Sequence, residues 1–384
     1  MSDFSEVTQI SFFSRIKDAF VGLVFGGLLF AAAFVLLFWN EGRAIKTMKS
    51  LEEGAGAVVS AGIDRVDPAN EGRLVHVSGD AATAEALQDA AFGLSAHALR
   101  LRRKVAMYQW TENSQTQTEK QIGGGEVKKT VYSYKQGWSD RAVDSHAFHQ
   151  AGHDNPSALP YNSQDWTASK ATLGAFILSN SLIQQMDAFQ PLAVLPSSLP
   201  AELSAKLKPA EGSFFQGADP ANPQVGDVRV SFLTVAPQTV SVVSKQLGAT
   251  FEPYATKAGR NIDILVLGAH GADEMFKSAM ANNQAMTWAL RAGGFVMMFI
   301  GLVLLFRPLD VLADVLPFLG WIVTAGTTML SFVFAAALSL ATVAVAWIAY
   351  RPLIGGALLV GAIAFFVKGM SHKSAAAPTQ AIPA

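Results

Sequence analysis

Long uncharged hydrophobic stretches lie near both ends of the chain and enclose a polar central region. A helix of about 20 residues crosses the ~30 Å hydrocarbon core of a bilayer. The pattern therefore predicts four transmembrane α-helices, at residues 20–39, 291–309, 318–350 and 352–368. Arg15 and Lys17 precede the first stretch as they would in a signal peptide, but its length favours an uncleaved anchor.

The two ends of the chain differ in character. Residues 1–19 are predicted to form a leader whose residues 11–19, with Phe12, Phe13 and Ile16 at near-helical spacing, lie in the interface as an amphipathic helix. A flexible leader is the alternative. Residues 369–384 are small and polar, which predicts a disordered tail.

Residues 40–290 are predicted to form a large β-rich α+β domain outside the membrane, inserted between the first two spans. Residues 99–110 and 130–134 read as a long hairpin with a mobile tip. Strands are also expected as a pair at 228–235 and 239–243, and at 262–267. The apolar spacing predicts helices at 81–92, at 170–188 and from about residue 272 into the second span.

The amino-acid composition excludes several classes of partner and site. Only 15% of the residues are charged, against about 25% in an average soluble domain. The net charge of −1 gives no basic surplus for nucleic acid, and the lack of cysteine excludes disulfides and thiolate metal sites. Basic residues flank the predicted spans almost equally on both sides, so the positive-inside rule has little force. A domain this long translocates largely regardless of charge, which favours an extracytoplasmic location.

Short sequence blocks resemble the transmembrane protein 43 (LUMA) family, beginning with Asn-Glu-Gly-Arg at 40–43. The blocks follow the family's order over nearly the whole chain: Asn40–Arg43, Ser50–Gly54, Val58–Ser60, Leu74–Gly79, Gly152–Ser157, Phe176–Ser179, Val225–Phe232, Thr287–Arg291 and Tyr350–Leu353. The resemblance implies four spans, a large lumenal or periplasmic domain between the first two, and self-association. The family offers no catalytic motif. Short Ala- and Gly-rich loops make this chain look like a bacterial member, with the domain in the periplasm and the spans in the inner membrane.

Charged and aromatic residues lie where the domain meets the first two spans. We expect these interfacial residues to couple the two helices through ion pairs and a shared tryptophan belt: Trp39, Glu41, Arg43, Trp288 and Arg291. The alternative is a set of independent interfacial charges. Small residues at four-residue spacing are candidates for close helix packing: Gly22, Gly26, Gly27, Ala31, Ala357 and Gly361. They serve packing within one chain or association between copies.

His146, His149 and His153 are the best candidates for a metal site, although weak ones, because three imidazoles lie within eight residues. Their spacing matches no recognised zinc pattern, so a polar loop is the preferred interpretation and no cofactor is expected. Motifs for phosphate cradles, nucleophile elbows and metalloproteases are missing, and no ionisable residue lies deep in a predicted span.

We therefore expect a non-enzymatic, self-associating scaffold in the bilayer that organises membrane or partner proteins. Those partners are unknown. The alternative is an oligomeric channel or transport accessory lined by Thr324, Thr327, Thr328 and Ser331, since an uncharged but polar helix suits a passive pore. An interfacial enzyme acting on lipid is a third hypothesis.

Overall fold

The chain divides into a β-rich unit and a helical unit. The computed structural model describes residues 4–194 and 199–350. The β-rich unit comprises residues 1–9, 49–119 and 127–280, and the helical unit comprises 10–48, 120–126 and 281–384. The fourth predicted span, the tail, Ala357 and Gly361 all lie outside the described residues.

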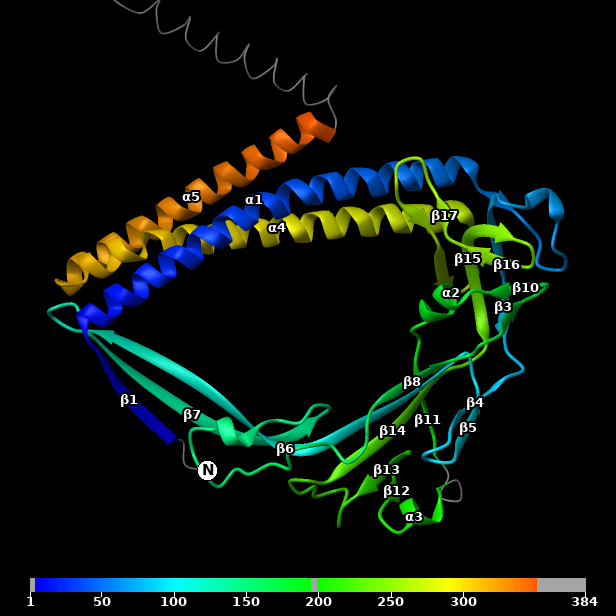
Figure 1. Ribbon diagram of the computed structural model, residues 1–384, viewed down its shortest axis with the longest axis horizontal. Helices are drawn as coiled ribbons and strands as arrows, with labels where there is room; N and C mark the ends of the chain where they lie inside the picture. The colour runs from blue at the N-terminus through cyan, green and yellow to red at the C-terminus, as the bar shows by residue number, and fades with distance from the viewer. Residues whose placement is uncertain (1–3, 195–198, 351–384) are drawn as a thin grey trace, which may run out of the picture. The chain divides into compact units, whose positions relative to one another are not determined.

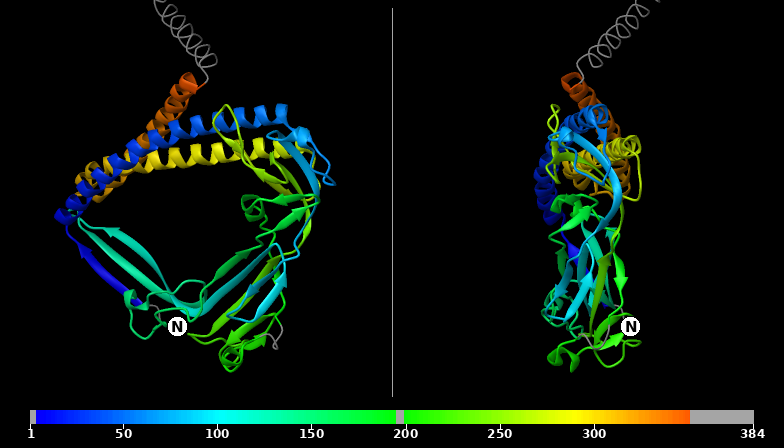
Figure 2. Two further views of the ribbon diagram at one scale, coloured as in Figure 1. Left: turned by 45° about the vertical axis from the view of Figure 1, so that its right-hand side comes forward. Right: turned by 90° about the vertical axis from the view of Figure 1, so that its right-hand side faces the viewer.

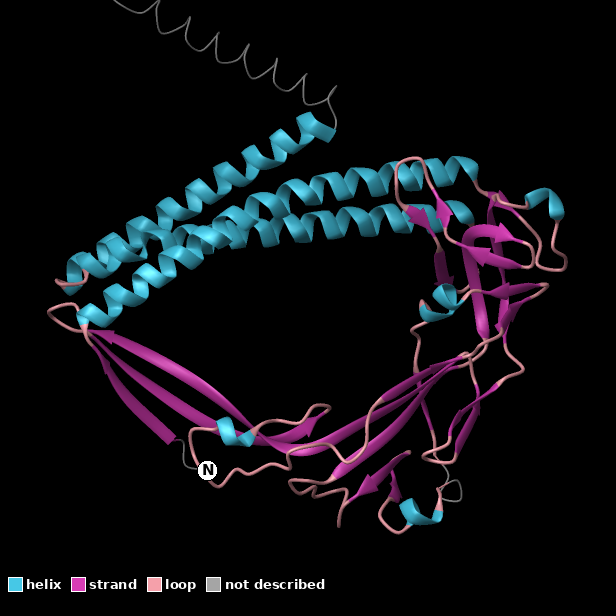
Figure 3. Cartoon of the chain, viewed as in Figure 1, coloured by secondary structure: helices cyan, strands magenta, loops and turns pink. Residues whose placement is uncertain are grey.

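The first sheet of the β-rich unit has eight strands, drawn in magenta in Figure 3. Its central order is β1-β7-β6-β14-β13-β12, with β11 added to β14 and β8 to β6. The bounds are β1 Phe4–Ile10, β6 Arg100–Lys120, β7 Glu126–Ser139, β8 Gln164–Thr167, β11 Gln190–Leu192, β12 Lys208–Ala210, β13 Ser213–Gln216 and β14 Val228–Val235.

The second sheet has seven strands in the order β19-β15-β16-β10-β9-β3-β2, with β15 also paired to β3. Its bounds are β2 Val59–Ser60, β3 Leu74–Ala82, β9 Ala171–Leu173, β10 Phe176–Leu178, β15 Gln238–Leu247, β16 Thr250–Glu252 and β19 Ile264–Leu267. Two ribbons complete the strands: β4 Ala86–Asp89 with β5 Leu94–His97, and β17 Tyr254–Ala255 with β18 Asn261–Ile262. Short helical turns are η1 Pro68–Asn70, η2 Ser145–Ala147, α2 Asn180–Gln184 and α3 Ala201–Ser204.

Alternation of apolar side chains builds the core beneath each sheet. On β14, Val228, Val230 and Phe232 are buried and face the same side, as a strand's two-residue period requires. Phe232 packs edge-on against Phe92, with ring centroids 5.7 Å apart. The second sheet has its own core, which includes Val77, Leu173, Phe176, Val242 and Phe251.

The predicted hairpin is confirmed and is longer than expected. Residues 99–110 and 130–134 lie almost entirely within β6 and β7, which are neighbours in the first sheet. The polar residues 111–120, expected in a mobile tip, continue β6 instead. Only residues 121–125 turn, closed by a hydrogen bond from the Gln121 amide to the Gly125 carbonyl at 2.8 Å.

Other secondary-structure predictions are wrong. Residues 81–92 contain the end of β3 and all of β4 rather than a helix, because burial of Leu87 and Asp89 on alternate positions outweighs the helix propensity of alanine. Residues 170–188 form β9, β10 and the short α2. Gly174, at φ +59°, turns the chain between these strands, and a Cβ there would collide with Ile63.

Two strand predictions were only partly right. The strands at 228–235 and 239–243 exist, but they do not pair with each other. β14 pairs with β6 in the first sheet, whereas β15 pairs with β3 in the second. The strand predicted at 262–267 is divided at Asp263 between β18 and β19, which belong to different sheets.

Long helices make up the helical unit. They are α1 Phe12–Ala57, α4 Ala272–Ala313 and α5 Pro317–Tyr350. Each is long and apolar enough to cross a membrane. The predicted spans at 20–39 and 291–309 lie within α1 and α4, and the predicted span at 318–350 lies within α5. The expected interfacial helix at 11–19 runs into α1 without a break, and the residues before it form β1.

Helices α1 and α4 lie side by side in the different views of Figures 1 and 2. Two glycines, Gly26 and Gly301, lie where these helices are in tight contact. A Cβ on Gly26 would lie 2.6 Å from Leu304 Cβ and 2.8 Å from the Gly301 carbonyl oxygen. A Cβ on Gly301 would lie 2.9 Å from the Phe30 amide nitrogen. The absence of side chains therefore sets the spacing of the helices, as in small-residue packing elsewhere in membranes.

We expect Gly26→Ala to lower the free energy of unfolding in micelles by about 1–3 kcal/mol, because the added methyl group would overpack the α1–α4 contact. Gly27→Ala is the matched control, since its Cβ would meet nothing nearer than Leu305 Cδ2 at 3.9 Å. Both changes alter helix propensity alike. Equal stability of the two variants would contradict the packing argument.

Candidate functional site

A buried carboxylate joins the long helices at one end of the helical unit. Glu41 of α1 is 2% exposed. Its Oε1 accepts a hydrogen bond from Arg291 Nε of α4 at 2.7 Å, and its Oε2 accepts from Arg291 Nη2 at 2.9 Å. Trp347 of α5 donates its indole Nε1–H to the same Oε2 at 2.8 Å. One carboxylate thus holds a cation and an indole from two other helices.

Further polar contacts are made from the same turn of α1. Arg43 donates from Nη1 to Asn283 Oδ1 at 3.1 Å and from Nη2 to Thr287 Oγ1 at 3.0 Å. Asn40 donates from Nδ2 to the Thr287 carbonyl at 3.1 Å, and Asn283 donates to the Ala44 carbonyl at 3.0 Å. Residues 40–44 are therefore fastened to residues 283–291 of α4. We call this set and the Glu41 contacts the interfacial network.

Two exposed tryptophans lie next to the interfacial network in the sequence. Trp39 and Trp288 are 53% and 60% exposed, as suits side chains at headgroup level. The Arg291 guanidinium lies 4.7 Å from the Trp288 ring centroid. The sequence named Trp39, Glu41, Arg43, Trp288 and Arg291 as interfacial residues, but it missed the network members Asn40, Asn283, Thr287 and Trp347. The only signal for Trp347 was its place in the last turn of a long apolar span.

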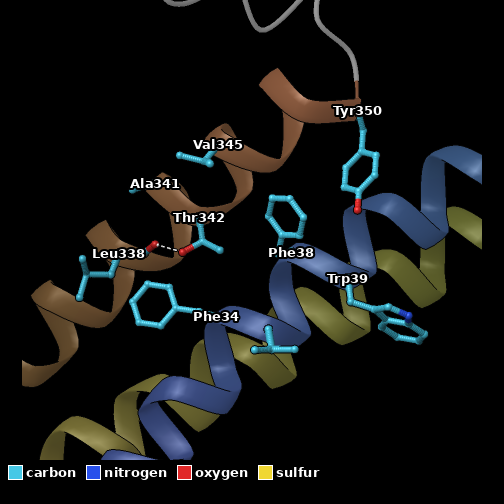
Figure 4. Close-up of a pocket in the computed structure, with 9 residues that line it drawn as sticks. Phe34, Phe38, Trp39, Leu338, Ala341, Thr342, Val345 and Tyr350 are labelled. Carbon is cyan, nitrogen blue, oxygen red and sulfur yellow. Dashed lines mark hydrogen bonds between the residues drawn. The ribbon is translucent and has the colours of Figure 1, made fainter.

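An apolar groove lies beside the interfacial network, between α1 and α5 (Figure 4). It has a volume of about 640 Å³ and is lined by Phe34, Val35, Phe38, Trp39, Leu338, Ala341, Thr342, Val345 and Tyr350. The Thr342 hydroxyl donates to the Leu338 carbonyl of its own helix at 2.7 Å, and most of the other lining side chains are hydrocarbon. Such a lining favours hydrocarbon and offers no reactive group.

An ionic cluster that sequence reasoning missed closes the opposite end of the helical unit. Arg15 is 8% exposed and Asp314 is 1% exposed. Arg15 Nη2 lies 2.7 Å from Glu126 Oε1 and 2.5 Å from Asp314 Oδ2, and Lys120 Nζ lies 2.6 Å from Asp314 Oδ1. Arg15 also donates to the Gly124 carbonyl at 2.6 Å. The tip of the β6–β7 hairpin is thereby bound to the start of α1 and to the α4–α5 turn.

The predicted small residues have different surroundings. Gly26 is buried against α4, whereas Gly22 and Gly27 lie in looser contact with it. Among these residues, Gly26 packs closely against another helix of the same chain. Ala31 is exposed and can contact lipid or another protein.

The three histidines do not converge on a metal. His149 stacks on Tyr132 at 3.9 Å and its Nδ1 lies 2.9 Å from Glu112 Oε1, while His153 stacks on Tyr134 at 3.8 Å. His146 is exposed, in a turn capped by Asp144. Among the described residues, no group of three histidine, cysteine, aspartate or glutamate side chains could hold a metal ion.

Tyr134 and Glu112 form the hydrogen-bonded centre of this aromatic cluster. The Tyr134 hydroxyl donates to Glu112 Oε2 at 2.6 Å and accepts from the Gln150 amide at 3.0 Å. Burial, followed by the hydrogen bond to Glu112, raises the pKa of Tyr134 to about 12. These contacts hold the phenol neutral and fix the loop after β7, which is a structural role.

The polar residues of α5 do not share one environment. Thr324 and Ser331 have buried hydroxyl oxygens without a hydrogen-bond partner. Thr327 donates to Asp310 Oδ1 at 2.7 Å, and Thr328 is exposed. A second groove of about 510 Å³ is lined by Thr324 and Thr328, among other residues, and by Lys120.

Apolar helices joined by a buried ion pair, together with a large β-rich unit, define an integral membrane protein. The family model described as Transmembrane protein 43 matches residues 107–352. The chain belongs to the transmembrane protein 43 family, which confirms the resemblance found in the sequence.

The relatives are similar over nearly their whole length. Mouse transmembrane protein 43 is 38% identical over 371 residues, which cover 93% of this chain and 90% of the relative. The human protein is 38% identical over 372 residues, covering 93% and 91%. The Drosophila homolog is 31% identical over 357 residues, covering 90% and 93%. No solved structure gives a significant match. These relatives are all animal proteins, so the expected bacterial origin has no support among them.

We expect Arg291→Met to lower the free energy of unfolding in micelles by about 2–4 kcal/mol, since it leaves the buried Glu41 carboxylate without its cation. Lys17→Met removes a positive charge from α1 outside the described contacts of the interfacial network and is the control. A loss below about 0.5 kcal/mol in Arg291→Met, within the range of a neutral surface change, would show that the ion pair carries little stability.

Tyr134 gives a pH-dependent prediction. Its folded pKa of about 12 exceeds the unfolded value near 10, so its contribution to stability is complete below about pH 10 and is lost as the pH rises through 12. Compared with the wild type, Tyr134→Phe should show a shallower fall in the free energy of unfolding between these pH values. The free energies of unfolding are measured by urea titration at each pH. If they fall equally steeply with pH in the two proteins, the raised pKa of Tyr134 is contradicted.

Proposed function

We propose that this protein is a non-enzymatic membrane scaffold that self-associates and uses its β-rich unit to organise membrane or partner proteins. The observation that carries the proposal is the interfacial network. It fixes α1 and α4 to each other at residues 40–44 and 283–291, just before both helices continue into the β-rich unit at Lys49 and Met280. A scaffold needs such a rigid base, because a domain on loose tethers cannot hold its partners in a fixed position.

The non-enzymatic part of the proposal is supported by how the ionisable groups are used. The buried groups Glu41, Arg15, Asp314 and Arg103 all engage opposite charges within the protein. Arg103 Nη1, for example, lies 2.5 Å from Asp89 Oδ2, and both side chains are nearly inaccessible. Paired charges of this kind fix structure and are not poised for proton transfer to a substrate.

Self-association is supported by an apolar stripe along α1. Its exposed members recur every three or four residues: Val21, Val24, Leu28, Ala31 and Val35. Val21, Val24, Leu28 and Val35 are each more than 60% exposed. Ala31 makes a notch in this stripe at which a second helix could approach closely. A second copy of the chain is the occupant we propose for it.

A channel or transport accessory is the second candidate. Exposed Thr328 and the groove that it lines with Thr324 give α5 a partly polar side that an oligomer could turn toward a pore. The Ser331 hydroxyl is buried within the chain. This proposal also requires that α5 cross the bilayer. We place the β-rich unit outside the cytoplasm, because long domains translocate largely regardless of flanking charge. The periplasm of a bacterial inner membrane stays a prediction from the sequence.

The scaffold proposal is tested by crosslinking the full-length protein in its native membrane and identifying what is captured. We expect homo-oligomers together with a small, reproducible set of membrane proteins. Ala31→Leu should weaken the homo-oligomer band, whereas Leu28→Met, which conserves volume on the same stripe, should not. Monomers alone, in the membrane and after transfer to nanodiscs, would refute self-association. Ion flux through purified protein in liposomes would favour the channel.

A further inference from the structure

The apolar groove between α1 and α5 has one wall from each helix (Figure 4). The α5 wall is a single stripe, because its residues recur three and four positions apart: Leu338, Ala341, Thr342 and Val345. Val345 is 58% exposed and Ala341 is also exposed, so none of the described residues covers the outer part of this stripe. The groove is therefore an open apolar surface that another hydrophobic segment can fill.

A further uncharged segment follows the groove directly in the sequence. Tyr350, the last residue of α5, lines the groove, and the described residues end there. Residues 353–367 carry no charge and lie between Arg351 and Lys368. These fifteen residues make about 22 Å of helix, whereas the twelve steps from Leu338 to Tyr350 span about 18 Å. The segment is long enough to fill the groove along its whole length.

A short connection favours the return of this segment along α5. Pro352 has no amide hydrogen and disfavours a helical conformation at Arg351, so the sequence predicts a break in the helix at this point. Antiparallel helices are joined by roughly two to five residues. Such a tether keeps the segment at a high effective concentration beside the groove, whereas a lipid or a second copy must arrive from the bilayer. The next segment of the same chain is therefore the favoured occupant.

Small residues give this segment a face that fits against α5. Ala357 and Gly361 are four positions apart and would share one face of a helix. In an antiparallel pair with its connection centred on Arg351, Ala357 comes beside Val345 and Gly361 beside Ala341. Small side chains at facing positions let two helices approach closely, which stabilises their association in lipid.

We propose that residues 353–367 return as a helix into the groove between α1 and α5 and pack against the α5 stripe through Ala357 and Gly361. The filled groove covers Val35, at the end of the exposed α1 stripe, and leaves Val21 to Ala31 for a second copy. The inference goes beyond the scaffold role and does not depend on it.

Disulfide crosslinking within one chain tests this packing, because the protein has no cysteine of its own. Two double variants place cysteines at facing positions: Val345→Cys with Ala357→Cys, and Ala341→Cys with Gly361→Cys. Leu340→Cys with Gly361→Cys is the matched control, since Leu340 is 72% exposed and does not line the groove. The full-length variants are oxidised with copper phenanthroline in native membranes, denatured, and treated with a polyethylene glycol maleimide, which slows the migration of chains that keep free thiols.

We expect both groove pairs to lose the maleimide shift as monomers about tenfold faster than the control pair, because a disulfide needs Cα atoms about 4.4–6.8 Å apart. Thiols that stay free in both groove pairs, or react no faster than in the control, would overturn the proposal and leave the groove to lipid. Disulfide-linked dimers of these variants would also overturn it, in favour of a second copy.

Two reactive thiols in each variant before oxidation, together with resistance to carbonate extraction, check that the variant is intact and inserted in the membrane. Failure of self-association in the crosslinking of the unmodified protein would leave the result for the groove pairs unchanged, so the two proposals fail separately.

Discussion

A charge beside lipid must be paired, and this constraint shapes both ends of the helical unit. Glu41 and Asp314 are almost inaccessible to solvent, and each engages a guanidinium and a further donor from another segment. Desolvating either carboxylate alone would cost several kcal/mol, so the partners must be present for the helices to pack at all. Because the partners come from distant parts of the chain, satisfying the charges also fixes which helix lies beside which.

Between the two ionic ends, the helices are held by close van der Waals packing. Gly26 and Gly301 allow α1 and α4 to approach until side-chain and backbone atoms nearly touch. Ala33, Leu37, Met298, Leu302 and Ala335 form a core between α1, α4 and α5. Lipid provides no hydrophobic force between helices, so close van der Waals contact and the paired charges are the stabilising interactions that remain. A helical unit held at both ends and packed in the middle is suited to bearing a domain and to offering its remaining apolar surface to lipid or to a second copy.

The sequence predicted the apolar helices well because long uncharged runs have few alternative structures. It also predicted the interfacial residues, since tryptophan and charge at the edge of an apolar run mark a headgroup boundary. It could not predict the partner of each charge: Arg15 and Asp314 are 299 positions apart, and only the fold brings them together. The helix expected at 81–92 failed for a related reason, because alanine-rich local propensity says nothing about a strand neighbour far along the chain. Strand β1 was missed for the same reason, because its neighbour β7 lies far along the chain.

Glu41 and Arg291 act as a coupled pair that holds α1 to α4. A double-mutant cycle with Glu41→Gln, Arg291→Gln and the double variant, measured as free energies of unfolding in micelles, tests it most directly. We expect a coupling energy of about 1–3 kcal/mol, with the double variant more stable than the sum of the two single losses implies. Strictly additive losses would contradict it, because they would show that the two side chains contribute independently.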